Sequence, residues 1–172
     1  MLNNFAIIKR MDMLGLLIGQ RGRWSATVAK ECRDGASSPG LENMAAADAI
    51  FGDLLYPLGA ERVDIAVLRD KMAEQGDAPN KHLGEAETLV IMQRQEFQSS
   101  FFVTDDLGAR REAKRVGITS FTTWDILRLL VRGRRLDLAD FHVDAEMLIK
   151  MNRGRPPGWP NRATIEQWLI SG

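Results

Sequence analysis

The sequence places two adjacent carboxylates, Asp105 and Asp106, directly after the short apolar stretch 101–104. That stretch predicts a buried strand, and in an open parallel sheet ligands bind beyond the carboxyl ends of the strands. Carboxylate oxygens suit Mg²⁺, which keeps several waters and needs only one or two such ligands. The competing interpretation is structural, because Asp is also a preferred N-cap and a helical pattern begins here.

Further acids lie near the starts of two other predicted helices, at Glu31, Glu85 and Glu87. Glu85 and Glu87 are two residues apart on a helix, so only one of them is expected to enter a given site. Glu87 borders the apolar face of its helix, whereas Glu85 suits the helix dipole. Each glutamate taken alone is typical of a solvated surface acid. Their combination with Asp105 and Asp106 favours a metal site.

Basic residues follow both late strands of the pattern. Arg110 and Arg111 come directly after the double Asp, and Arg128 comes after the second apolar stretch. Such runs are usually solvated helix faces. Beside a carboxylate–metal site they would be able to hold a phosphate backbone.

Other chemistries find less support. Cys32, with His82 or His142 as a base, is the one possible thiol nucleophile, but a lone Cys is more often a small buried hydrophobe and Glu31 disfavours its thiolate. Two His and one Cys show no zinc-motif spacing, and neither phosphate-loop motif occurs. Trp24 and Trp124 are expected in the core rather than stacked on bases.

The composition indicates one globular domain. The chain has 172 residues, 45% of them hydrophobic, with 23 basic and 23 acidic residues and one Cys. Its apolar runs are far below the roughly 18 residues that span a bilayer, and its N-terminus does not resemble a signal peptide. We therefore expect a cytoplasmic protein with no membrane association. Zero net charge argues against strong nonspecific attraction to nucleic acid but leaves room for a local basic patch.

The hydrophobic pattern predicts an α/β protein that is rich in helix. Strand, helix, strand, helix with short links over 101–132 implies parallel strands joined by right-handed crossovers. We expect helices over 4–18 (capped by Asn3 or Asn4), 28–33, 41–55, 63–72, 84–95, 107–116, 124–132, 138–151 and 164–170, and strands over 24–26, 101–104 and 118–121. Residues 1–172 then form a single domain, with 136–172 as a helical C-terminal extension.

Several short motifs, in this order and spacing, resemble the PIN-domain family of nucleases. The resemblance covers Met1 to about Gly133. It rests on the T-V-x-x-E pattern of 27–31 (one position shifted from the family's), GEAE at 84–87, TDD at 104–106, Arg110, Ala113, Gly117-Ile118, Thr123, Leu127 and Gly133. The stretch 2–17 resembles the helix that follows the family's first strand. The resemblance implies a three-layer α/β/α fold with a short parallel sheet.

The resemblance also implies an activity and its residues. PIN domains are metal-dependent nucleases, and many are ribonuclease toxins of toxin–antitoxin pairs. By position it implies Glu31, Glu87 and Asp106 as ligands of Mg²⁺ or Mn²⁺, with Asp105 as their neighbour or substitute in the catalytic set. Thr123 matches a hydroxyl that the family keeps near its site. The expected partners are single-stranded RNA, an antitoxin protein and a second copy of the chain, and Arg110, Arg111 and Arg128 would hold the RNA phosphates.

One departure from the family is serious. The family's first strand, which lies at the centre of its sheet and ends in an Asp, would precede Met1, and Asn3 and Asn4 do not replace that charge. Either the start site is misassigned or the gene is truncated, and the DNA upstream decides between the two. We expect the chain as given to be a poor nuclease. The alternative is a non-catalytic, PIN-derived interaction module that exposes apolar residues such as Phe5 and Met13 to a partner.

Overall fold

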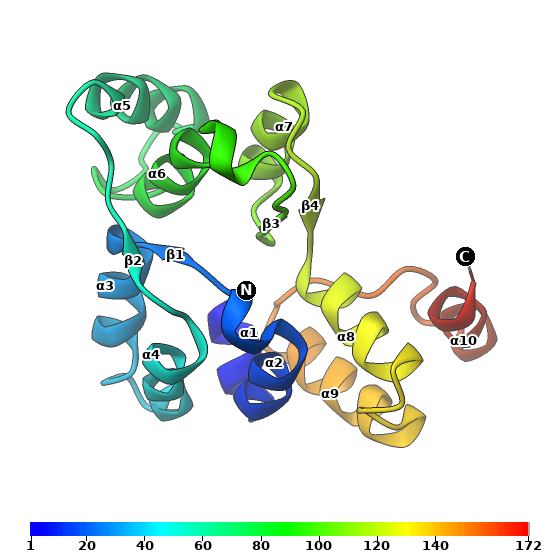
Figure 1. Ribbon diagram of the computed structural model, residues 1–172. Helices are drawn as coiled ribbons and strands as arrows, with labels where there is room; N and C mark the ends of the chain where they lie inside the picture. The colour runs from blue at the N-terminus through cyan, green and yellow to red at the C-terminus, as the bar shows by residue number, and fades with distance from the viewer. Residues whose placement is uncertain (172) are drawn as a thin grey trace.

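The computed structural model describes residues 1–171, with every side chain among them except that of Gln20. Figure 1 shows the elements along the chain. The α-helices are α1 (Leu2–Ile7), α2 (Met11–Ile18), α3 (Ala26–Gly35), α4 (Ala47–Ile50), α5 (Glu61–Met72), α6 (Leu83–Ile91), α7 (Leu107–Arg115), α8 (Thr123–Arg132), α9 (Leu138–Lys150) and α10 (Arg162–Ile170). The 3₁₀ helices are η1 (Gly19–Arg21), η2 (Glu42–Ala46) and η3 (Gln95–Phe97), and the strands are β1 (Trp24–Ser25), β2 (Leu54–Leu55), β3 (Phe102–Val103) and β4 (Ser120–Phe121).

The strands form two separate parallel pairs. In one, β1 pairs with β2, and Trp24 lies opposite Leu54; in the other, β3 pairs with β4, and Phe102 lies opposite Ser120. The expected α/β class, the richness in helix and the parallel pairing over 101–121 are confirmed. Within residues 1–171 no strand joins the two pairs into one sheet.

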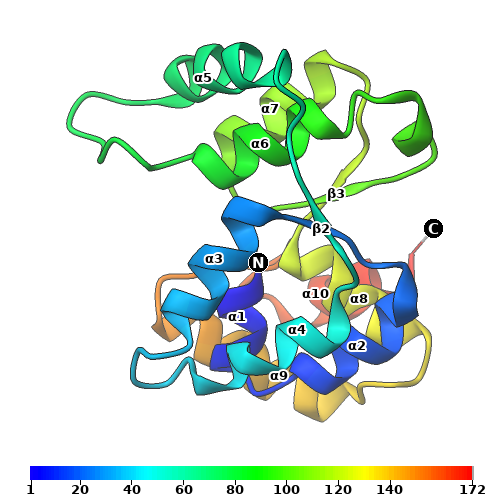
Figure 2. The same ribbon diagram turned by 60° about the vertical axis from the view of Figure 1, so that its left-hand side comes forward.

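The buried side chains form two cores rather than one. The first core gathers residues of α1–α4 and α8–α10 around side chains such as Phe5, Leu127 and Phe141. The second gathers α5, α6 and α7 around side chains such as Leu89 and Phe102. Figure 2 shows the two bodies one above the other, with strands at their junction.

Local capping explains why α7 and α8 begin and end as predicted. The Asp106 carboxylate accepts the Ala109 amide at 2.7 Å, and Gly117 with φ +76° follows the last turn of α7. Thr122 and Asp125 form a capping box at the start of α8, with each side chain accepting from the other's backbone amide.

The single helix predicted over 4–18 is wrong. The chain breaks into α1 and α2 at Lys9, whose φ is +56°, and the next side chain, Arg10, reaches Asp144 and Asp140 on α9. The expected Asn cap is also wrong, because Asn4 lies inside α1 with its amide buried. Phe5, expected on the surface, is fully buried, and Met13 is half-buried, so the exposed apolar face expected for a partner is not formed by this pair.

The helix predicted over 41–55 is also wrong in its second half. It begins as η2 and α4, as its alanines favour, but Leu54–Leu55 forms β2. Two long-range contacts pull the chain out of the helix: Phe51 stacks on Trp24 with ring centroids 5.1 Å apart, and the Gly52 amide donates to the Gly22 carbonyl. Tertiary packing thus overrides local propensity here.

The C-terminal third is helical, as expected. Ile165 and Leu169 of α10 are buried in the first core, and α10 packs against α8. None of the helices in the described part of the chain is both long and apolar enough to cross a lipid bilayer.

Candidate functional site

Asp105 ties the carboxyl end of β3 to α1 and α8. Its carboxylate accepts the Thr123 amide at 2.7 Å, the Thr123 hydroxyl and the Asn4 side-chain amide at 3.0 Å. The Met1 ammonium lies 3.3 Å from the same carboxylate. Asn4 and Thr123 are themselves buried and joined by a 3.1 Å hydrogen bond. Donors therefore surround Asp105 on several sides.

Asp106 combines a structural and a site-facing role. One carboxylate oxygen caps α7, as the structural interpretation of this pair predicted, and the other lies 3.6 Å from Nδ1 of His82. Its backbone amide donates to the Thr104 hydroxyl at 3.2 Å. His82 immediately precedes α6, so the second oxygen of Asp106 faces the start of that helix.

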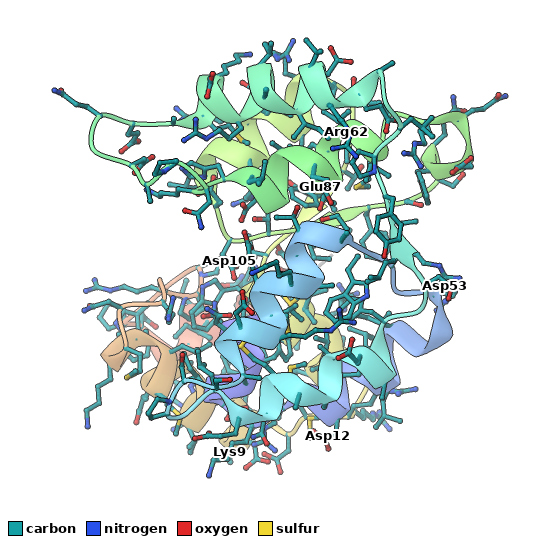
Figure 3. The ribbon with its side chains drawn as sticks, turned by 90° about the vertical axis from the view of Figure 1, so that its left-hand side faces the viewer. Lys9, Asp12, Asp53, Arg62, Glu87 and Asp105 are labelled. Carbon is teal, nitrogen blue, oxygen red and sulfur yellow. The ribbon has the colours of Figure 1, made fainter. Side chains whose placement is uncertain are left out.

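Glu87 joins the two bodies through α3. It is buried, and its carboxylate accepts the Thr27 amide at 3.1 Å and the Thr27 hydroxyl at 2.6 Å. Because Thr27 lies in the first turn of α3, the negative charge also suits the positive end of that helix. One residue further along α6, the Thr88 hydroxyl lies 3.2 Å from that of Ser25. Figure 3 shows Glu87 and Asp105 at the junction of the two bodies.

Glu31 lies against the first turn of α6. A Cβ atom on Gly84 would be 3.1 Å from its Oε2, so the absence of a side chain at Gly84 makes room for this carboxylate. Partial burial raises the pKa of Glu31, and the like charges of Glu85 and Glu87 raise it further. In the described part of the chain neither Glu31 nor Glu85 has a hydrogen-bond or ion-pair partner.

These carboxylates border one region without forming one coordination sphere. Glu31 touches α6 at Gly84 and Asp106 faces it at His82, whereas Glu87 turns toward α3 and Asp105 toward α1 and α8. Among residues 1–171 no three His, Cys, Asp or Glu side chains come close enough to hold a metal ion. The residues as arranged therefore do not fit a divalent ion held by all three implied ligands.

The expected phosphate-binding residues separate into two places. Arg110 and Arg111 line a hollow beside α7. Arg128 instead lies over the Trp168 ring, 5.4 Å from its centroid, and its guanidinium lies 3.4 Å from the Ser171 hydroxyl, so it holds α10 against α8. Thr123, the fourth expected substrate-binding residue, donates its amide and its hydroxyl to the Asp105 carboxylate.

Cys32 is buried, as expected of a structural cysteine. Burial raises the pKa of its thiol to about 11, and Sγ faces the Met44 carbonyl at 3.6 Å. His82 lies beside Asp77 and Asp106, and His142 lies beside Glu166. A thiolate nucleophile with a histidine base finds no support in this arrangement.

Sequence reasoning missed two residues of this region. The sequence pattern places Asn4 at a helix cap and offers His82 only as a partner of Cys32. The one local signal for His82 was its place beside the GEAE motif; the contacts of Asn4, which reach residues about a hundred positions away, left none.

No protein-family model, curated protein or solved structure matches this sequence.

Proposed function

We propose that the protein is a metal-dependent ribonuclease of the PIN-domain type, which hydrolyses phosphodiester bonds of single-stranded RNA. The observation that carries the proposal is that Glu31 and Asp106, from segments far apart in the sequence, border the same first turn of α6. The two parallel strand pairs and the position of Asp105 and Asp106 just beyond β3, after Thr104, support it further. The three-layer α/β/α arrangement of the family belongs to the same proposal.

Electrostatics supports a cation at this edge. Glu31, Glu85 and Glu87 repel one another, which contributes to the raised pKa of Glu31, and the attraction of the neighbouring Lys30 ammonium does not reverse that shift. Mg²⁺ or Mn²⁺, when bound, supplies an acidified water and stabilises charge on phosphate. Since Glu31, Glu87 and Asp106 do not share one coordination sphere, we assign no catalytic step to an ion here.

The direct test combines metal binding with cleavage. Wild-type protein is titrated calorimetrically with Mn²⁺ and assayed on single-stranded RNA with and without EDTA. Asp106→Asn keeps a good N-cap for α7 while removing the charge, and Glu31→Gln removes an unpaired carboxylate. Both should abolish metal-dependent cleavage, whereas Glu146→Gln, on the exposed side of α9, should retain it. Absence of both binding heat and cleavage in the wild-type protein would overturn the proposal.

A second candidate function is a non-catalytic interaction module derived from such a nuclease. It is favoured by the extensive hydrogen bonding of Asp105 and Glu87, whose carboxylates already serve as structural ties. Its partner would be an antitoxin protein or a second copy of the chain. Sedimentation of the purified protein, alone and with an antitoxin encoded beside it, would reveal such a complex, and Mn²⁺ would then produce no heat. A toxin role and a cytoplasmic site of action accompany the first candidate.

A further inference from the structure

A hollow of about 490 Å³ runs along α7 toward the start of β4. It is lined by Leu107, Arg110, Arg111, Lys114, Gly117, Ile118, Thr119 and Ser120. Three of these residues are cations, and none of the lining residues is an acid. In a chain with zero net charge, this concentration of positive charge marks the hollow as an attractive place for an anion.

The cations of this hollow differ from their neighbours in being unpaired. Lys71 of α5 and Arg115 of α7 both bond to Glu112, each at 2.8 Å, and the first of these ion pairs joins α5 to α7. Among the described residues, by contrast, Arg110, Arg111 and Lys114 have no acidic or hydrogen-bonding partner, and Nε of Arg110 is buried without an acceptor. Unpaired guanidinium and ammonium groups that line one hollow favour a bound oxyanion.

The hollow adjoins Asp106. An ideal Cβ atom on Gly108 would lie 3.1 Å from Oδ1 of Asp106 and 4.0 Å from Nη2 of Arg111, so the two side chains flank the same glycine. From Leu107 to Lys114 the helix advances about 10 Å, at roughly 1.5 Å per residue. An extended anion that touches Lys114 can therefore also reach the neighbourhood of Asp106.

An exposed aromatic residue, Phe101, stands beside the far end of the hollow along the paired strands. The Phe102 amide donates to the Thr119 carbonyl at 2.8 Å, which brings the preceding residue, Phe101, beside this lining residue. Phe101 is 56% exposed, and its ring is held edge-on against Phe121 with centroids 5.0 Å apart. Cations for the backbone together with an aromatic platform for a base are the combination that binds single-stranded nucleic acid.

We infer that this hollow binds the phosphate backbone of single-stranded RNA, with Arg110, Arg111 and Lys114 on the phosphates and Phe101 stacked on a base. The choice of RNA as ligand rests on the proposed function. The inference adds the path of the strand, which runs along α7 from the side of Asp106 toward β4. It also assigns Lys114 and Phe101 to the interface and leaves Arg128 out of it.

The test measures binding without cleavage. Fluorescence anisotropy of a short fluorescein-labelled oligouridylate is recorded in EDTA, which stops any metal-dependent hydrolysis. The double variant Arg111→Glu/Lys114→Glu should raise the Kd at least about tenfold and flatten the salt dependence of log Kd by about one unit per lost phosphate contact. Phe101→Ala should raise the Kd about tenfold with an unchanged salt dependence.

A matched control carries the same change of net charge elsewhere. Arg62→Glu/Lys150→Glu reverses two exposed cations on α5 and α9 and should change the Kd less than about twofold. Equal losses in both double variants, no loss in the first, or binding of inorganic phosphate without binding of the oligonucleotide would overturn the inference. Binding that depends on Arg111 and Lys114 in a protein that never cleaves RNA would uphold the inference and count against the nuclease alone.

Discussion

His82 and Asp106 face each other across the junction of α6 and α7, with the imidazole Nδ1 3.6 Å from the carboxylate Oδ2. On its other side the imidazole Nε2 lies 3.3 Å from Asp77, in the turn before α6. His82 adopts a left-handed backbone conformation with φ +65°, which an L side chain adopts at a cost of about 1 kcal/mol or more. Two carboxylates thus lie within 4 Å of its buried ring, and Nε2 makes no hydrogen bond to the described residues.

Replacing His82 should therefore destabilise the protein, even when the new residue tolerates a left-handed backbone. His82→Asn keeps a side chain that tolerates the left-handed region but loses the bridge to Asp77 and Asp106, and we expect the free energy of unfolding to fall by about 1 kcal/mol. Urea denaturation measures the difference. Asn152→Gly, at another left-handed position, should be close to neutral. Equal stability of His82→Asn and wild type would show that the bridge contributes nothing.

The Thr27–Glu87 contact predicts a second effect. Thr27→Val removes the hydroxyl donor, which is 2.6 Å from Glu87, and leaves a buried carboxylate with one donor fewer. We expect a loss of about 1–2 kcal/mol in the free energy of unfolding. Thr164→Val, on an exposed face of α10, is the control and should change little. A loss of the same size in the control would mean that the effect comes from helix propensity.

Gly84 predicts a steric effect at the contact of α3 with α6. A Cβ atom there would lie 2.8 Å from Val28 Cγ2 and 3.1 Å from Glu31 Oε2, so Gly84→Ala forces the helices apart. We expect it to lower the free energy of unfolding by about 1–3 kcal/mol. Gly59→Ala, where a Cβ meets nothing within 4 Å, should be neutral or slightly stabilising. Thermal or urea unfolding of the two variants compares them directly.

The buried pair of Arg10 and Asp144 predicts a dependence on pH. Burial raises the pKa of Asp144 above its ordinary value of 3.8, although Arg10, with its Nε 2.9 Å away, opposes the shift. Because the pKa is raised in the folded state, protonation of Asp144 favours folding. The contribution of Asp144 to the free energy of unfolding is therefore largest at low pH and is lost as the pH rises through its folded-state pKa. The difference in unfolding free energy between wild type and Asp144→Asn should therefore slope with pH in this range.

Removing the guanidinium tests the same pair from the other side. Arg10→Met leaves the Asp144 carboxylate buried without its cation and should lower the unfolding free energy at neutral pH by about 2–3 kcal/mol. The loss should shrink as pH falls and Asp144 becomes protonated. Urea denaturation over pH 3.5–7 measures the free energy of unfolding of Asp144→Asn and Arg10→Met. A loss that is constant over this range would mean that Arg10 acts through packing alone.

Local signals predicted the parts of the fold that local interactions determine. Caps and a terminal glycine fixed α7 and α8 almost to the residue, and the apolar stretch before Asp105 correctly indicated a strand. The break at Lys9 and the strand β2 were missed, because they depend on contacts with residues distant in sequence, such as Asp144 and Trp24.

The candidate site divides in the same way. The positions of Asp105 and Asp106 after a strand and of Glu31 and Glu87 on helices follow from pattern, and the structure has them there. The partners of each carboxylate did not follow, because they come from other elements of the chain: Thr27 of α3 for Glu87, His82 before α6 for Asp106 and Asn4 of α1 for Asp105.

The two cores differ in how the chain builds them. The buried members of the second core run from Ile65 to Ala113, whereas those of the first come from Leu2 to Phe51 and from Trp124 to Leu169. The second body is thus a continuous insertion held to the first by short strand links and polar ties such as Thr27–Glu87. We expect a segment of this kind to unfold as a unit while the amides of the first core stay protected from hydrogen exchange. The rate of ligand binding at the carboxylates between the two bodies would then depend on how often the second body opens.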